Sequence, residues 1–212
     1  MNRITFRPTD NEGNDMSPEL ASFAEFIGLT SAAPDRYSIL LVLQLYAGMK
    51  SGHLYPAKVI YEINALEGSG PPSQLKAPIL FKHAPLQGLW HKHYLEDGLS
   101  SMAKNLQRGL LKFGIPSFVE GVRESQATGI ERQMTADNVK AVVDDVVRGN
   151  WLRLGSSASL TGEWIIYADH DSKKYYLCLG KHQKSEHQTL RDQIDAVCCN
   201  EFEFLAGLLV KT

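Results

Sequence analysis

The chain contains few cysteines, and their arrangement excludes two common uses of this residue. Only three of its 212 residues are cysteine, namely Cys178, Cys198 and Cys199. An odd count with two adjacent thiols does not make a disulfide framework, and no CxxC spacing indicates a zinc site. We therefore expect reduced thiols, packed as small hydrophobic side chains, in a cytoplasmic protein.

Long hydrophobic runs are missing as well. The most apolar stretch covers residues 38–49, whereas a helix needs about 20 apolar residues to cross a bilayer. The first residues also lack the apolar segment of a signal peptide. The sequence therefore predicts a soluble protein with no membrane partner.

Neither sign of charge is in large excess. The chain has 22 Lys+Arg and 24 Asp+Glu residues, for a net charge of -2, and it is 43% hydrophobic. This balance excludes wholesale disorder and a uniformly polybasic nucleic-acid binder, although a local basic patch remains compatible with it.

The common phosphate-binding and nucleophile motifs are absent too. The most glycine-rich segment, residues 67–73, carries two prolines where a phosphate cradle needs free backbone amides. No GxSxG elbow is present. We therefore expect no cofactor.

The hydrophobic pattern predicts an α+β fold, in which a helical N-terminal half packs on a small antiparallel sheet in the C-terminal half. Helices are expected at 18–27, 36–49, 55–66, 95–113, 136–147 and 189–199. Short β-branched and aromatic runs predict a β-hairpin, with strands at 162–168 and 174–179. We expect a flexible arm over 1–17 and a single domain over 18–212, with a loop or sub-domain break at 67–73.

Two of these helices carry clear apolar stripes. In the helix at 95–113 the stripe consists of Leu99, Met102, Leu106, Leu110 and Phe113. In the helix at 136–147 five valines, at positions 139, 142, 143, 146 and 147, predict the buried face, and Gly149 is expected to end the helix.

A histidine cluster stands out from this background. His83, His91 and His93 fall within eleven residues, interleaved with Lys82 and Lys92. If 89–94 is extended, His91 and His93 share one face, and Trp90, Lys92 and Tyr94 take the other. Paired imidazoles suit acid–base chemistry near pH 7. Alternatively they could bind a metal, with His83 as a third ligand and Glu96 or Asp97 completing the set.

The cluster lies in the most basic part of the chain. Residues 75–155 hold 11 basic and 8 acidic side chains, whereas the segments on either side are net acidic. Cations beside histidines favour a phosphate-bearing substrate, because they stabilise both bound phosphate and a developing phosphorane. Lys82 and Lys92 are the candidate phosphate ligands, and Trp90 and Tyr94 are candidate substrate contacts. A solvated helix face would explain the basic residues of 104–112 equally well.

The C-terminal hairpin resembles a known family. Its strands at 163–168 and 175–179 lead into Gly180-Lys181-His182, and this arrangement resembles the closing hairpin of RelE-type and barnase-like bacterial ribonuclease toxins. The resemblance implies a small sheet that presents basic and acid–base residues to RNA, with Lys181 and His182 at the RNA-facing end of the last strand.

Together these observations favour a phosphodiester-cleaving enzyme, namely a metal-independent ribonuclease of toxin or effector type. His91 and His93 would share the general base and acid roles, with His83 and His182 in the same site and RNA as the partner. One alternative is a non-catalytic interaction protein, such as an immunity or adaptor protein, with structural histidines and with 38–49 and 202–209 facing a protein partner. The other is a histidine-ligated metal hydrolase.

Overall fold

The computed structural model describes residues 7–96, 98–131 and 133–209. These residues divide into two compact units. Unit 1 contains 1–73, 77–97 and 162–212, and unit 2 contains 74–76 and 98–161. Within the single domain predicted over 18–212, the contacts thus form two compact units. The predicted break at 67–73 ends where the chain first leaves unit 1. Most of unit 2 enters later, at 98–161, within the basic stretch of the sequence.

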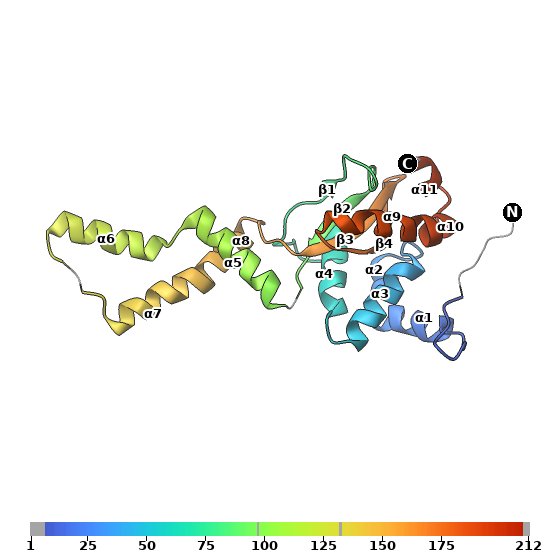
Figure 1. Ribbon diagram of the computed structural model, residues 1–212, viewed down its shortest axis with the longest axis horizontal. Coiled ribbons are helices and arrows are strands. Elements are labelled where there is room, and N and C mark those ends of the chain that lie inside the picture. The colour runs from blue at the N-terminus through green and yellow to red at the C-terminus, as the bar shows by residue number, and fades with distance from the viewer. Residues whose placement is uncertain (1–6, 97, 132, 210–212) are drawn as a thin grey trace. The chain divides into compact units, whose positions relative to one another are not determined.

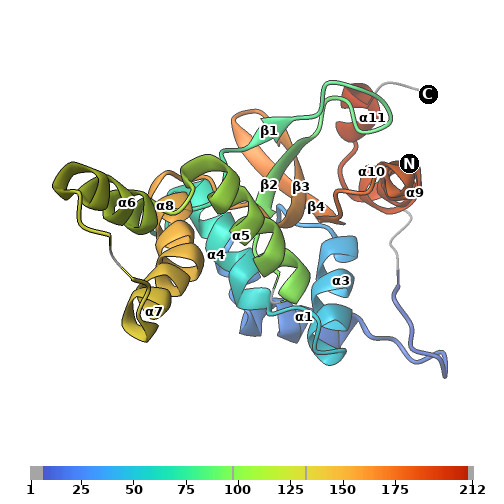
Figure 2. The same ribbon diagram turned by 60° about the vertical axis from the view of Figure 1, so that its left-hand side comes forward.

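Unit 1 has the α+β fold that the sequence predicts. Its sheet contains β1 (Ile79–Leu80), β2 (Trp90–Tyr94), β3 (Glu163–His170) and β4 (Lys173–Gly180), all antiparallel and in that order (Figures 1 and 2). At the tip of the β3–β4 hairpin, Asp171 and Ser172 both have positive φ angles, of 50° and 60°. A two-residue turn of this kind matches the right-handed twist of the paired strands.

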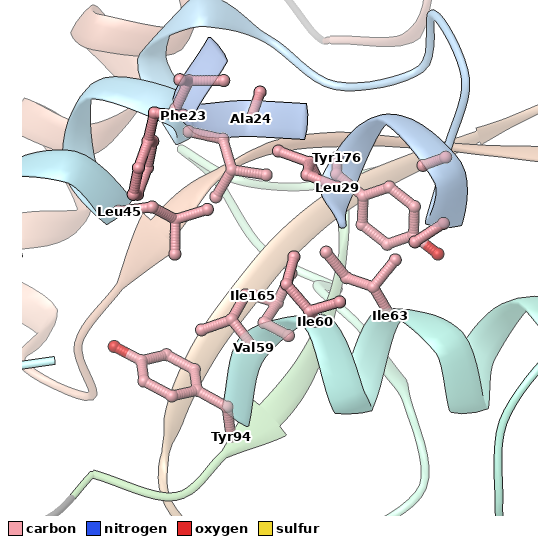
Figure 3. Close-up of a cluster of buried hydrophobic side chains, with 14 of the residues drawn as sticks. Phe23, Ala24, Leu29, Leu45, Val59, Ile60, Ile63, Tyr94, Ile165 and Tyr176 are labelled. Carbon is pink, nitrogen blue, oxygen red and sulfur yellow. The ribbon is translucent and has the colours of Figure 1, made fainter. Parts of the chain in front are cut away.

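Four helices cover one face of this sheet. They are α1 (Ser17–Phe26), α2 (Leu29–Ala32), α3 (Ile39–Lys50) and α4 (Pro56–Glu67). The Ser38 hydroxyl caps α3 by accepting from the Leu41 amide, and Gly68 ends α4 in the left-handed conformation. Their apolar side chains pack on Tyr94, Ile165 and Tyr176 of the sheet (Figure 3).

The C-terminal helices cover the opposite face and are drawn in red in Figure 1. They comprise the 3-10 turn η2 (Lys184–Glu186), α9 (His187–Gln193), the π-helical turn η3 (Ile194–Cys198), α10 (Cys199–Glu201) and α11 (Leu205–Leu208). Trp164 and Ile166 pack against them, whereas Ile165 and Tyr167 pack on the other face, because neighbouring residues of a strand alternate in direction.

The two apolar segments that the interaction hypothesis assigned to a partner lie in these cores. Leu41, Val42 and Leu45 of α3 are buried under the first face. Leu205 and Leu209 are buried under the second. These side chains of both segments therefore stabilise unit 1 itself.

Unit 2 is helical and contains two helices that the sequence did not predict. Its elements are α5 (Leu99–Phe113), α6 (Pro116–Thr128), α7 (Ala136–Asp144), the π-helical turn η1 (Asp145–Gly149) and α8 (Asn150–Ser156). Gly149 does not end the helix that begins at Ala136. The chain passes through η1 into α8, and Asp145 fixes this turn by accepting from the Ser117 amide and pairing with Arg153.

The buried faces of unit 2 differ from the predicted ones. On α5 the buried residues are Ser101, Asn105 and Gly109, while Leu99 is 85% exposed. An added Cβ at Gly109 would lie 2.8 Å from the Asn150 Cβ, so α5 and α8 meet at small and polar side chains. The predicted valine face is not fully buried either: Val142 and Val146 are half-buried, and the other three valines are exposed.

The described part of the predicted flexible arm is a closed turn. The Asp10 carboxylate accepts hydrogen bonds from the amides of Glu12 and Asn14, both at 2.9 Å, and Thr9 pairs with Asp15. This turn leads directly into α1. Residues 1–6 of the arm lie outside the described residues. Within the described ranges, no helix has the length and apolar character needed to cross a bilayer.

Candidate functional site

Strand β2 separates the predicted site residues onto two faces. His91 pairs with Ile166 and His93 with Trp164, so both histidines face the C-terminal helices. Lys92 pairs with Ile165 on the face that α1–α4 cover. The division of the strand into a histidine face and a Trp90/Lys92/Tyr94 face is therefore confirmed.

Trp164 lies at the centre of a group of aromatic rings on the histidine face. The centroid of its ring is 4.6 Å from His91, 4.5 Å from His182 and 5.4 Å from His187. His93 completes the group, 5.6 Å from His91 and 5.1 Å from His182. Three of the four predicted catalytic histidines are thus brought together, with a fourth ring that the sequence reasoning did not select.

The backbone carbonyl of Gly162 orients two of these rings. The His93 Nδ1 lies 2.7 Å from this oxygen and the His182 Nε2 lies 2.8 Å from it. A carbonyl only accepts, so we assign a proton to each of these nitrogens, which makes His93 Nε2 and His182 Nδ1 the basic nitrogens of the neutral rings. The Glu163 carboxylate holds the same segment by accepting from the His182 amide at 3.0 Å.

The four rings differ in their access to solvent. His91 and His93 are only 8% and 2% exposed, whereas His182 is exposed and His187 is half-buried. A buried ring cannot contact the phosphate of a polynucleotide. This burial argues against the acid and base roles expected for His91 and His93 and directs attention to His182 and His187.

His187 has an environment that suits a general base. Burial lowers the pKa of His187 below its ordinary value, and the nearby Lys184 and His182 side chains lower it further, so the ring is neutral at pH 7. Its buried Nε2 has no hydrogen-bond partner within the described structure, and neither has the Trp164 Nε1. Buried polar atoms left unpaired are uncommon in proteins, and a catalytic role is one reason for them.

A cavity of about 350 Å³ adjoins this group at the end of β4. Its wall includes Gln44, Tyr94, Lys181, Glu186, His187 and Gln193. Gln44 is fixed there, because its side-chain oxygen accepts from the Leu179 amide at 2.6 Å. The predicted substrate contacts Tyr94 and Lys181 therefore share one cavity with His187.

The remaining predicted residues lie elsewhere. Lys92 is buried on the opposite face, 3.2 Å from a Glu62 carboxylate oxygen and 2.7 Å from the Ser73 hydroxyl. Trp90 stacks on Tyr167 on that same face. Lys82 and His83 are exposed in the loop between β1 and β2. The phosphate-binding role expected for Lys92 is thus corrected to that of a structural ion pair.

The ligand set proposed for a metal is not assembled in the described part of the chain. No group of three or more His, Cys, Asp and Glu side chains there has an arrangement that could hold a metal ion. Asp97, one of the two carboxylates considered, lies outside the described residues.

The sequence reasoning missed His187 and the central role of Trp164. His187 stands in a polar segment without periodicity, so no pattern distinguishes it from a surface histidine. The signal that could have found it is the second pair, His182 and His187, at the end of the aromatic hairpin.

Comparisons with protein-family models, with curated protein sequences and with solved structures found no match to this chain. The resemblance to RelE-type and barnase-like ribonucleases therefore rests on the residues of the hairpin alone.

Proposed function

We propose that unit 1 cleaves phosphodiester bonds, with RNA as the substrate. The observation that carries the proposal is that His182 and His187 both contact Trp164, beside a cavity whose wall includes Lys181. An exposed imidazole, a half-buried imidazole and a cation are the groups that such a reaction needs.

The lowered pKa of His187 and the solvent exposure of His182 suggest a division of labour. The neutral His187 takes the proton of a ribose 2′-hydroxyl as this oxygen bonds to the adjacent phosphorus. The bond from phosphorus to the 5′-oxygen breaks as protonated His182 donates its Nδ1 proton to that leaving oxygen. Lys181 and Lys184 stabilise the negative charge that develops on the phosphorane. The products are a 2′,3′-cyclic phosphate and a 5′-hydroxyl.

His91 and His93 act as positioning residues in this scheme. His93 stacks on His182 at an interplanar angle of 14° and shares the Gly162 carbonyl with it. Protonated His182 keeps its Nε2 proton on that carbonyl while Nδ1 acts on substrate. The buried rings therefore support the orientation of the accessible one.

The position of two residues in the hairpin supports a biological context for this proposal. Lys181 and His182 directly follow β4, where the resemblance to the ribonuclease toxins expects the RNA-facing residues. We therefore place the activity with toxins or effectors that act on RNA in the cytoplasm. The three free cysteines accord with a reducing compartment.

The test is cleavage of RNA by the purified chain and by His182→Ala, His187→Ala and Lys181→Ala. We expect each histidine variant to lose about 10²–10⁴-fold in rate, the range of general acid–base catalysis. The cyclic product is identified by mass spectrometry. His53→Ala is the matched control, because His53 is exposed and lies in the turn between α3 and α4.

Two further results distinguish the metal-independent ribonuclease from the other hypotheses. Activity that persists in EDTA supports the metal-independent scheme, and activity that EDTA removes and one metal restores supports the metal hydrolase. Wild-type protein that leaves RNA intact, or full activity in both folded histidine variants, would refute the proposal.

A further inference from the structure

Tyr94 of β2 contributes an unpaired hydroxyl group to the cavity beside His187. The residue is only 4% exposed, and within the described ranges no other residue forms a hydrogen bond with this hydroxyl. Figure 3 shows Tyr94 at the edge of the hydrophobic cluster, with its hydroxyl directed away from Val59 and Ile60. A tyrosine hydroxyl that is buried usually has a partner. A ligand in the cavity would supply the partner that the chain does not.

Gln44 of α3 offers a second group in a fixed position. Its Oε1 accepts from the Leu179 amide at 2.6 Å, and its Nε2 donates to the Leu179 carbonyl at 3.4 Å. These two bonds hold the side chain against the edge of β4. Because an amide nitrogen carries two protons, Nε2 has one N–H left to donate to a ligand.

One side of the C-terminal helices completes the wall of the cavity. Glu186, Thr189, Leu190 and Gln193 all line it. Their spacings of three and four residues place them on the same side of the helix. Leu190 and Leu179 add apolar surface, whereas Thr189 and Gln193 add groups that both donate and accept hydrogen bonds.

The charges of the wall indicate which part of an RNA chain fits the cavity. Lys181 and Glu186 are oppositely charged, and both line it. A carboxylate repels a phosphate group, whereas apolar surface with amides and hydroxyls suits a flat, uncharged ring with polar edges. The volume of about 350 Å³ lies within the range of small-ligand sites, about 300–1,000 Å³. A nucleobase therefore fits this wall better than the phosphate or the ribose does.

We propose that this cavity binds one unpaired base of RNA, with Tyr94, Gln44 and Gln193 hydrogen-bonded to the edge of that base. The inference rests on the proposed function, because the RNA substrate supplies the base. His187 lines the cavity and takes the 2′-hydroxyl proton in the proposed reaction, so the base belongs to the nucleotide that carries this hydroxyl. A base in the cavity has left its pairing partner, and the substrate class is therefore single-stranded RNA.

The first experiment measures binding without cleavage, by calorimetry with the four nucleoside 3′-monophosphates and with inorganic phosphate. We expect at least one nucleotide to bind about tenfold or more tightly than inorganic phosphate. Tyr94→Phe should weaken that nucleotide about two- to tenfold, the value of one hydrogen bond, and leave phosphate binding unchanged. Since the Tyr94 hydroxyl has no partner in the described chain, this variant should unfold at the same urea concentration as wild type. Tyr55→Phe is the matched control, because Tyr55 is 62% exposed at the start of α4 and does not line the cavity.

The second experiment measures cleavage of a single-stranded RNA oligonucleotide at one defined linkage. An abasic ribose on the 5′ side of that linkage removes the base but keeps the 2′-hydroxyl and the phosphate. We expect it to slow cleavage there about tenfold or more. An abasic ribose on the 3′ side is the control and should be cleaved at the normal rate. Annealing the intact oligonucleotide to its complement should protect the linkage.

The outcomes separate this inference from the proposed reaction. Nucleotides that bind no better than inorganic phosphate, or a Tyr94→Phe variant with wild-type affinity, would overturn the base site. Normal cleavage beside the 5′ abasic ribose would do the same while leaving the reaction in place. Wild-type protein that leaves RNA intact but binds a nucleotide through Tyr94 would refute the reaction and support the base site.

Discussion

Gly162 meets two demands, and the second of them requires glycine. Its carbonyl accepts from the His93 and His182 rings, and an added Cβ would lie 1.8 Å from the Tyr94 oxygen. The backbone must therefore approach β2 closely to bring the two histidines together. In the sequence this residue is simply one of 17 glycines, and nothing local marks it.

We predict that Gly162→Ala lowers the free energy of unfolding by about 2 kcal/mol or more, because relief of this overlap requires backbone movement. It should also disturb the His182 side-chain NMR signals. The measurement is urea denaturation. Gly207→Ala is the control, since a Cβ at Gly207 meets no atom within 4 Å. Equal stability of the two variants would contradict the close approach.

His187 makes the pH dependence predictable. Its folded pKa is lowered, chiefly by burial, relative to an unfolded value near 6.5. The unfolded state therefore binds the proton more readily, so stability from this group is present above pH 6.5 and is lost as the pH falls through the folded pKa. We expect an NMR titration midpoint below 6.5 that rises in Lys184→Ala, because one repelling cation is removed. A midpoint at or above 6.5 would contradict this assignment.

At the scale of elements, alternation along strands was predictable and helix burial was not. The faces of β2 follow from a period of two residues, which a short stretch of sequence contains. The β3–β4 hairpin was predicted as well, but its strands run to 170 and start at 173, closer together than the predicted ends at 168 and 174. The faces of α5 and α7 depend on what packs against them. On α5, Asn105 is buried and bonds the Thr161 backbone, while Leu99 is exposed. A hydrophobic stripe predicts that some surface covers the helix. It does not show whether that surface belongs to the same chain.

The buried ion pair that joins β2 to α4 leads to a prediction at this scale. Lys92 and Glu62 are both buried, and burial lowers the pKa of Lys92 against the opposing effect of Glu62. Lys92→Met leaves the Glu62 carboxylate buried without its cation, and we expect a loss of about 3–5 kcal/mol of stability. Lys92→Met/Glu62→Leu should recover most of it. Thermal or urea unfolding measures both, and a double variant as unstable as the single one would contradict the pairing.

At the scale of the whole molecule, the most important feature is the position at which unit 2 interrupts the sequence of unit 1. Tyr94 and Glu163 pair directly across β2 and β3, and residues 98–161 lie between them in sequence. Neither hydrophobic core of unit 1 includes a residue of unit 2. The sequence could not reveal this, because the pairing joins residues that are distant along the chain.

We therefore predict that a short glycine-rich turn in place of 98–161 leaves unit 1 folded. Near-UV circular dichroism and the histidine NMR signals should be retained, since every ring around Trp164 belongs to unit 1. A chain that no longer unfolds cooperatively would show that unit 1 depends on its insertion.

The direct pairing of Tyr94 with Glu163 also bears on how such chains diverge. A hairpin loop tolerates changes in length, because the strands on either side hold the register. Lineages could gain, lose or exchange the segment between these two residues while keeping the sheet. Relatives of this chain are then best sought by aligning 7–96 and 162–209 alone, with the interval left free to vary from a tight turn to a separate module.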